Sequence, residues 1–189
     1  MGINMIRASI TMLLALTVLT GCIYPLAITV IAKVLFPAQA AGSLIVEGGK
    51  VKGSTLIGQS FEEPQYFWSR LSATGPFPYN AASSSGSNYG PNNPDLKKAM
   101  AARRAALEAA DPGNHAVPPI DLLTASASGL DPHISPEAAA YQASRVARVR
   151  NMPLAKVNQL IAEYTAGRQL GFLGEPTVNV VALNHALDR

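Results

Sequence analysis

The chain has 189 residues, of which 48% are hydrophobic, and it carries a formal net charge of +3 at pH 7. This length suffices for a short membrane anchor and one soluble domain. So small an excess of positive charge argues against a protein that binds nucleic acid. The single cysteine, Cys22, excludes an intrachain disulfide. The three histidines are too scattered in sequence for a zinc site, so we expect no metal ligands.

An uncharged, apolar stretch near the N-terminus runs from Ala8 to Ala32. As a helix it would rise about 37 Å, which exceeds the roughly 30 Å hydrocarbon core of a bilayer. The sequence therefore predicts three regions in chain order, namely a transmembrane anchor (1–34), a small-residue connector (35–53) and a single soluble domain (54–189).

Gly21 and Pro25 interrupt the apolar stretch, and Tyr24 lies between them. Both interruptions are tolerated in a spanning helix, and a small residue beside a proline leaves room for a second helix to pack closely. We therefore expect Gly21, Tyr24 and Pro25 to contact another membrane helix as well as the lipid bilayer.

The residues that flank the anchor bear on its orientation. Arg7 and Lys33 nearly balance the positive charge on its two sides. The start of the chain, with a basic residue before an apolar run, resembles a secretory signal. This favours a single-pass protein of the cell inner membrane, with a cytoplasmic N-terminus and a periplasmic soluble domain.

A lipoprotein is an alternative interpretation of the same segment. Leu19-Thr20-Gly21-Cys22 resembles a processing site at which Cys22 would be acylated. However, the apolar run continues from Ile23 to Ile31, whereas a processed lipoprotein usually turns polar soon after its cysteine. We therefore favour an uncleaved anchor over a lipoprotein or a cleaved signal.

The soluble domain is predicted to be α+β. Residues 54–61 and 66–71 are short apolar-rich runs and are predicted strands. The long segment 74–94 is rich in Gly, Pro, Ser and Asn, and a loop of that length usually serves a function, binds a partner or is disordered. Near the C-terminus, residues 178–183 are predicted to form a strand or a transition from strand to helix, and residues 184–188 a terminal turn.

Cap and stop signals predict three helices between these segments. Asn93 and Pro94 begin the first helix, which ends near Ala110, and Ser135 and Pro136 begin the second. The third helix follows Pro153 and ends near Thr165, with apolar residues at helical spacing along one face.

The most polar motif of the domain, residues 124–136, contains the residue types of a catalytic triad in Ser126, Ser128, Asp131 and His133. A membrane-anchored serine hydrolase is therefore an alternative function. The sequence lacks a Gly-x-Ser-x-Gly nucleophile elbow, and Asp131 is too close to His133 in sequence to orient it behind a serine. We favour a polar loop that ends in a helix cap, with no catalytic residue.

Nucleotide-binding motifs are absent from the sequence. It contains no Gly-x-x-x-x-Gly-Lys-Ser/Thr loop and no Gly-x-Gly-x-x-Gly motif after a strand, and Gly48-Gly49-Lys50 is too short to substitute. The Asp-Lys-Thr-Gly signature of phosphorylated transport ATPases is also absent. The chain is therefore not expected to hydrolyse ATP.

Several separated motifs nevertheless occur in a recognisable order. They are Thr20-Gly21, Tyr24-Pro25, Gly53-Ser54, 56–61, Tyr66-Phe67 with Arg70, Gly86-Ser87-Asn88, Gly90-Pro91, Asn93-Pro94, 121–136, Gln142, 145–147, Arg150, 178–180 and Leu183-Asn184. Over nearly its whole length the chain thereby resembles the C subunits (KdpC) of bacterial Kdp-type potassium-transporting P-type ATPases.

This resemblance implies a non-catalytic accessory subunit of a high-affinity, ATP-driven potassium uptake complex. The implied partners are a potassium-path subunit and the P-type ATPase subunit that hydrolyses ATP. The family is thought to stabilise the assembly, and it has been assigned an ATP-binding, chaperone-like role. ATP as a cofactor is implied by the resemblance only, and the residues that would bind it are unknown.

Overall fold

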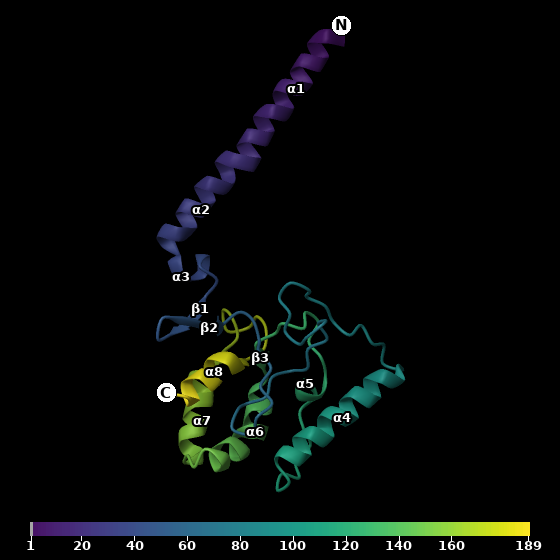
Figure 1. Cartoon of the computed structure of the whole chain (residues 1–189), viewed down its shortest axis with the longest axis vertical. Coiled ribbons are helices and arrows are strands. Elements are labelled where there is room, and N and C mark those ends of the chain that lie inside the picture. Colours follow the sequence, from purple (N-terminus) through teal and green to yellow (C-terminus); the bar gives the residue numbers. More distant parts are fainter. Residues whose placement is uncertain (1) are drawn as a thin grey trace. The chain divides into compact units, whose positions relative to one another are not determined.

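The computed structural model describes residues 2–189, which separate into two compact units, one ending at residue 44 and one covering residues 45–189. The first unit is a long apolar helix followed by a short helical turn (Figure 1). The second contains several helices and short strands. The prediction of one N-terminal apolar helix followed by an α+β domain is thus confirmed.

The long helix consists of α1 (Gly2–Val18), the π-helical turn η1 (Leu19–Ile23) and α2 (Tyr24–Leu35), and it is long and apolar enough to cross a membrane. The π-helical turn lies directly before Pro25, where the amide of Tyr24 donates to the carbonyl of Leu19. A proline lacks an N–H and crowds the preceding turn, so a wider turn accommodates it. The short helix α3 (Pro37–Ala40) follows.

A hairpin occupies much of the predicted connector. Its strands are β1 (Leu44–Glu47) and β2 (Lys50–Ser54). The turn residues Gly48 and Gly49 both have positive φ, of 54° and 76°. Two such residues are what a tight hairpin turn requires, so this pair of glycines belongs to a turn between strands.

The three predicted helices are α4 (Pro94–Ala110), α6 (Pro136–Val149) and α7 (Leu154–Glu163). The side chain of Asn93 accepts from the amide of Asp95 at 2.8 Å, and that of Ser135 accepts from Ala138 at 3.0 Å. These bonds satisfy amides that a helix start leaves without partners, which explains where both helices begin.

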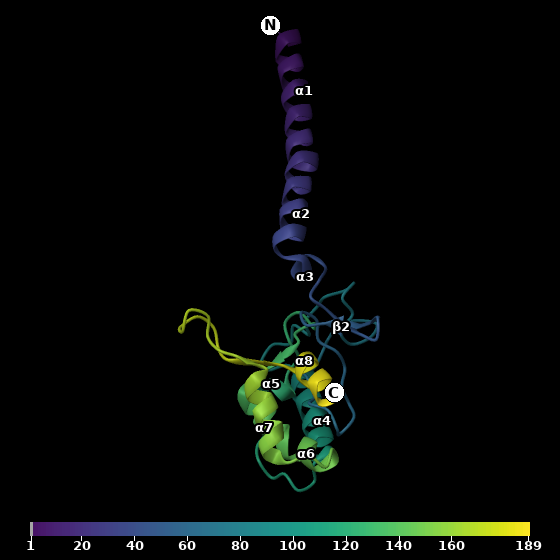
Figure 2. The same cartoon turned by 90° about the vertical axis from the view of Figure 1, so that its left-hand side faces the viewer.

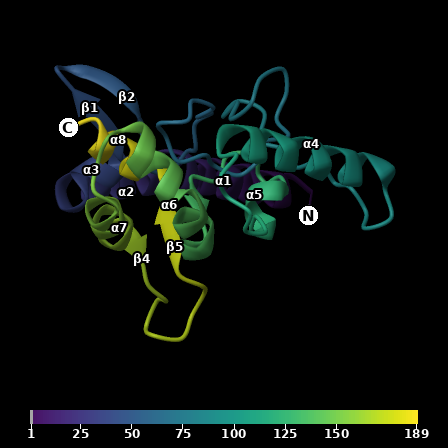
Figure 3. The same ribbon diagram turned by 90° about the horizontal axis from the view of Figure 1, so that it is seen from below.

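The remaining elements form a small antiparallel sheet and two short helices. The sheet has the order β3-β5-β4, from β3 (His133–Ile134), β5 (Thr177–Asn179) and β4 (Thr165–Ala166). Ile134 and Thr165 both pair with Val178 of the central strand. Figure 3 shows β4 and β5 side by side next to α6 and α7. The two short helices are α5 (Ile120–Leu123) and α8 (Val180–Leu187), which continues directly from β5.

The predicted strands over 54–61 and 66–71 are wrong. Ser54 is the last residue of β2, and the rest of both segments is irregular apart from isolated bridges at Ile57 and Leu71. The physical reason is clearest in residues 64–70, called here the core segment, because its centre, Phe67, Trp68 and Ser69, is buried in the domain. Their backbone groups bond to side chains from distant helices and loops instead of to a neighbouring strand.

Two side-chain amides act on this core segment as a paired strand would. Asn184 accepts from the amide of Phe67 at 2.8 Å and donates to the carbonyl of Phe67 at 2.9 Å. Gln142 does the same for Trp68, at 2.8 and 3.1 Å. All four side chains are buried, so these bonds replace water that the backbone has lost.

Arginines and a tyrosine satisfy the other carbonyls of the core segment. Arg145 donates to Tyr66 at 3.1 Å and also to Pro64, and Arg150 donates to Gln65 at 2.7 Å. The carbonyl of Ser69 accepts from the guanidinium of Arg103, and the carbonyl of Arg70 accepts from the hydroxyl of Tyr79. Every carbonyl from residue 64 to residue 70 therefore accepts a side-chain hydrogen bond.

Candidate functional site

The polar motif 124–136 was the strongest candidate for a site in the soluble domain, and its serines bond to the local backbone. Ser126 is 3% exposed, and its hydroxyl accepts from the amide of Gly129 at 2.9 Å. The hydroxyl of Ser128 accepts from Leu130 at 3.1 Å. Such bonds are typical of polar turns. They hold the buried hydroxyl of Ser126 against the backbone, whereas Ser128 lies on the surface and its one described side-chain contact is with a backbone amide.

Asp131 joins this motif to Arg70 and His133. One carboxylate oxygen lies 3.4 Å from Nη1 of Arg70, and the other lies 3.4 Å from Nδ1 of His133 and accepts its backbone amide at 3.0 Å. Burial alone would raise the pKa of the Asp131 carboxyl, but the bonds from His133 and the charge of Arg70 outweigh it and lower the pKa. The ion pair is therefore present above the ordinary carboxyl pKa and is lost as pH falls through the lowered value.

These contacts do not assemble a hydrolase triad. His133 faces Asp131, as a catalytic histidine would, but the contacts described for Ser126 and Ser128 are with backbone groups. A nucleophile needs a base within hydrogen-bond reach and access to substrate. Buried Ser126 has neither among the residues that the structure describes. The motif is better explained as a turn leading to the Ser135 cap of α6.

The long loop 74–90 packs against this motif. The amide of Ser85 and the hydroxyl of Ser84 both donate to the carbonyl of Ser128, at 3.0 and 2.9 Å. Gly129 has a φ of +68°, and a Cβ there would lie 2.7 Å from the carbonyl oxygen of Ser85. Only glycine fits both the backbone conformation and the close approach. The two loops therefore form one hydrogen-bonded surface.

A small polar hollow of about 90 Å³ lies beside this surface and is lined in part by Ser69, Arg70, Tyr79 and Arg103. Burial lowers the pKa of Arg103 and raises the pKa of the Tyr79 phenol. The hollow is far smaller than the roughly 300–1,000 Å³ of typical small-molecule sites. It is of a size to hold a few ordered waters.

The anchor offers a different kind of candidate site. Gly21 lies within η1, and a Cβ built on it would meet no atom within 4 Å, while the neighbouring Tyr24 is exposed. The hydroxyls of Thr20 and Thr29 bond to carbonyls of their own helix, at Leu16 and Pro25, so they do not add polarity to the outside. Gly21, Tyr24 and Pro25 thus lie in an apolar helix that has no buried residue from residue 2 to residue 35.

The sequence did not predict two features of the soluble domain. The first is the role of Gln142, Arg145 and Asn184 in satisfying the core segment, for which the one signal was their position between apolar residues of helices. The second is a set of exposed apolar residues after β4. Over residues 2–189, no three His, Cys, Asp or Glu side chains come together in a way that could hold a metal ion.

Comparison with known proteins gives a consistent result over the whole chain. Residues 6–189 match the family model described as "K+-transporting ATPase, c chain". Similar relatives include three proteins named "Potassium-transporting ATPase KdpC subunit". That of Polaromonas naphthalenivorans is 61% identical and covers 98% of this chain and 94% of its own length. That of Methylococcus capsulatus is 60% identical and covers 98% of this chain and 98% of its own length. That of Ralstonia nicotianae is 59% identical and covers 97% of this chain and 90% of its own length.

Proposed function

Because this chain belongs to the c-chain (KdpC) family of K+-transporting ATPases, we propose that it is a single-span, non-catalytic subunit that stabilises a high-affinity, ATP-driven potassium uptake complex. The observation that carries the proposal is the pairing of one uncovered apolar helix with a domain whose polar motif is occupied by structural hydrogen bonds. An apolar helix can pack against the helices of membrane partners, and the hydrogen-bonded serines form no activated nucleophile.

The proposed partners are a membrane-embedded potassium-path subunit and a P-type ATPase subunit that hydrolyses ATP. The anchor would pack against helices of these partners within the cell inner membrane, and the domain would cover the outer face of the potassium path. The N-terminus would then be cytoplasmic and the domain periplasmic.

Cysteine labelling tests the proposed orientation. Ala105 lies on the exposed side of α4, and Cys22 can be replaced by alanine so that an introduced thiol is unique. We expect Ala105→Cys in the Cys22→Ala background to react with a membrane-impermeant maleimide in cells whose inner membrane is intact. The Cys22→Ala chain alone is the control, and it should stay unlabelled.

Labelling of Ala105→Cys only after the inner membrane is permeabilised would contradict this orientation. It would favour the second candidate function, a cytoplasmic nucleotide-binding regulator, in line with the ATP-binding role that the family resemblance implies. The serine hydrolase would require labelling of Ser126 or Ser128 by an activity-based probe. The lipoprotein would require an acylated Cys22 at the N-terminus of the mature chain.

A substitution in the anchor tests the proposed helix contact. Because the space around Gly21 is open within this chain, Gly21→Leu should leave the chain folded and inserted. If another helix packs closely there, the added side chain should lower recovery of the partner subunits on the order of tenfold.

Ala15→Leu is the matched control for this substitution, because it adds bulk to the same helix on a different side. Recovery of partners should be measured by quantitative mass spectrometry after purification in mild detergent. Equal recovery with Gly21→Leu and the unsubstituted chain would contradict the contact at Gly21.

A further inference from the structure

The β1–β2 hairpin presents an exposed apolar face. Leu44 and Val46 of β1 and Val51 of β2 are 48%, 55% and 61% exposed. Side chains alternate between the two faces of a strand, and the two-residue turn at Gly48-Gly49 places Val46 opposite Val51. The three side chains therefore share one face of the hairpin. Exposed apolar side chains gathered in this way mark a surface for contact with a partner or a membrane.

The opposite face of the hairpin is fastened to the soluble domain. The carboxylate of Glu47 lies 2.8 Å from Nε2 of His185 in α8 and 3.6 Å from Nε of Arg189. Ile45, Glu47 and Lys52 also line a hollow of about 180 Å³ together with His185. Figure 2 shows the hairpin, labelled β2, at the edge of its unit next to α8. Because these residues alternate with the exposed ones, the apolar face is turned away from the domain.

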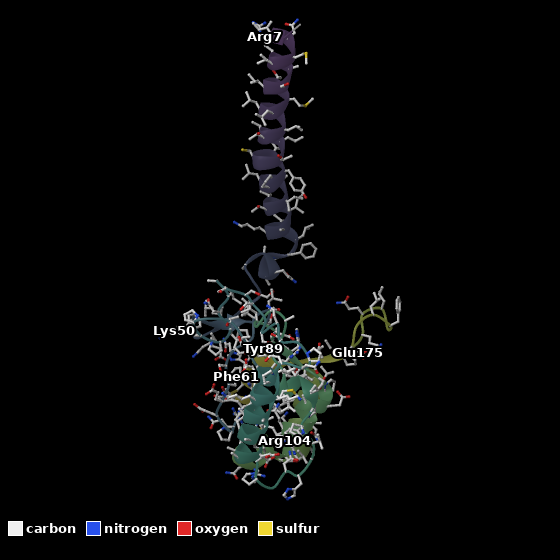
Figure 4. The ribbon with its side chains drawn as sticks, turned by 90° about the vertical axis from the view of Figure 1, so that its right-hand side faces the viewer. Arg7, Lys50, Phe61, Tyr89, Arg104 and Glu175 are labelled. Carbon is white, nitrogen blue, oxygen red and sulfur yellow. The ribbon has the colours of Figure 1, made fainter. Side chains whose placement is uncertain are left out.

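Lys50 and Lys52 add positive charge to the hairpin. Neither lysine forms an ion pair with any of residues 2–189, and the one acidic residue of the hairpin, Glu47, is held by His185 and Arg189. Figure 4 shows Lys50 at the outer edge of its unit. A long apolar stem lets an ammonium group reach a lipid phosphate while neighbouring apolar side chains lie deeper. Apolar residues beside unpaired lysines are the combination that binds an anionic membrane surface.

The hairpin is also the part of the soluble domain that lies nearest to the anchor along the chain. The anchor helix ends at Leu35 and β1 begins at Leu44, and the four residues of α3 lie between them. Since those four residues rise only as a helix does, the tether spans no more than about 25 Å. Lys33, in the last turn of α2, adds a further cation at the end of the anchor. The headgroups of the bilayer that the anchor spans are therefore within reach of the hairpin.

A second copy of the chain is a poor occupant of this face. The face consists of three side chains, which is far less surface than the roughly 1,200–2,000 Å² that a stable protein interface buries. Pairing two hairpins would also bring the unpaired lysines of both copies together. A bilayer does not need so large a contact, because the anchor already holds the hairpin beside it and raises its effective concentration there.

We propose that the β1–β2 hairpin lies in the headgroup region of the bilayer that the anchor spans. Leu44, Val46 and Val51 face the boundary with the acyl chains, and Lys50 and Lys52 bind the phosphates of anionic lipids. This contact holds the soluble domain against the membrane surface in a fixed orientation. The inference rests on the membrane span of the proposed function and on none of its partner subunits.

Quenching of a fluorescent probe by lipid tests this inference. The full chain, together with the subunits that co-purify, should be reconstituted in nanodiscs of phosphatidylcholine and phosphatidylglycerol that contain lipid spin-labelled near the top of its acyl chain. An environment-sensitive nitrobenzoxadiazole probe is attached to Val46→Cys in the Cys22→Ala background. We expect severalfold more quenching there than with the probe on Val117→Cys, the matched control at an exposed valine of another loop.

Removal of the two lysine charges supplies the second measurement. Lys50→Gln with Lys52→Gln should lower the ratio of docked to free hairpin on the order of tenfold in nanodiscs that contain phosphatidylglycerol, and should change little in phosphatidylcholine alone. Lys97→Gln with Lys98→Gln, at exposed lysines of α4, is the matched control and should leave the quenching unchanged. Equal quenching with both pairs would overturn the lipid contact of Lys50 and Lys52.

The results that overturn the inference differ from those that overturn the proposed function. If ATPase subunits co-purify but position 46 is quenched no more than position 117, the lipid contact is wrong and the proposed function stands. A blue-shifted probe without quenching has the same meaning, because another subunit or a second copy then covers the face. If quenching occurs but no ATPase subunit co-purifies, the lipid contact stands and the proposed function fails. A chain that does not enter nanodiscs contradicts both.

Discussion

Replacing Arg145 with methionine should lower the free energy of unfolding of the soluble domain by about 3 kcal/mol. Arg145 is 2% exposed and donates to the carbonyls of Pro64 and Tyr66 and, at 2.8 Å, to the side chain of Gln142. Methionine fills similar space but donates no hydrogen bond, so the part-buried carbonyls of Pro64 and Tyr66 and the buried side chain of Gln142 lose a donor. Each such loss costs roughly 1–3 kcal/mol.

Burial of the cation offsets part of this loss. Desolvation lowers the pKa of Arg145 to about 10, which means that the folded protein already bears a cost for holding the charge inside. Methionine removes that cost, so the expected effect is smaller than the sum over all the bonds broken.

Trp68 provides the measurement for Arg145→Met, because it is the single tryptophan and is 6% exposed. Urea unfolding of the full chain in detergent should be followed by its fluorescence. Midpoints should be compared and not intensities, since the Arg145 guanidinium lies 5.2 Å from the centre of the Trp68 ring. Arg104→Met, at a side chain 55% exposed, should leave the unfolding midpoint unchanged within error. Equal midpoints for the two variants would contradict the role assigned to Arg145.

Asn184→Leu should have an effect of similar size, about 3 kcal/mol, for a different reason. It leaves both the amide and the carbonyl of Phe67 buried without a partner. Gln142→Leu should act in the same way on Trp68, and the two effects should not simply add, because the affected residues are neighbours.

Asn92→Leu is the matched control for Asn184→Leu, because Asn92 is exposed in the loop before α4 and substitutions there should cost no more than about 0.5 kcal/mol. The same urea transition is the measurement, with far-ultraviolet circular dichroism as a second probe. A midpoint for Asn184→Leu within error of the control would mean that water or a rearranged backbone satisfies Phe67.

The helices could be predicted because their signals are local. Asn93 and Ser135 cap α4 and α6 through bonds that span two or three residues, so the cap and the helix start lie in the same short stretch of sequence. The anchor was predictable for the same reason, since an uncharged run of sufficient length is itself the signal.

The strand predictions were wrong where the local structure depends on residues far away in the sequence. Residues 66–71 have the composition of a strand, but the groups that bond to Phe67 and Trp68 come from Asn184 and Gln142, which are far away in the sequence. Gly48-Gly49 carries a signal that the sequence analysis did not use. The pair is too short for a phosphate loop, and two glycines between apolar runs indicate a hairpin turn, which the structure has.

In the candidate site, too, the sequence predicted the local features but not those that depend on distant parts of the fold. The sequence marked residues 124–136 as unusual but could not say whether Ser126 is exposed, and its burial is what decides against a nucleophile. The exposure of Leu170 and Phe172 was equally invisible, because apolar residues in a loop are as consistent with a core contact as with a projecting tip. Conversely, the open space around Gly21 agrees with an anchor that another helix can approach.

The most direct test is to purify the tagged full chain in mild detergent from cells grown at low potassium and to identify its partners by mass spectrometry. An accessory subunit predicts recovery of a potassium-path subunit and a P-type ATPase subunit in a constant ratio to the chain. Recovery of the chain alone, from a preparation in which other membrane complexes remain intact, would contradict this account.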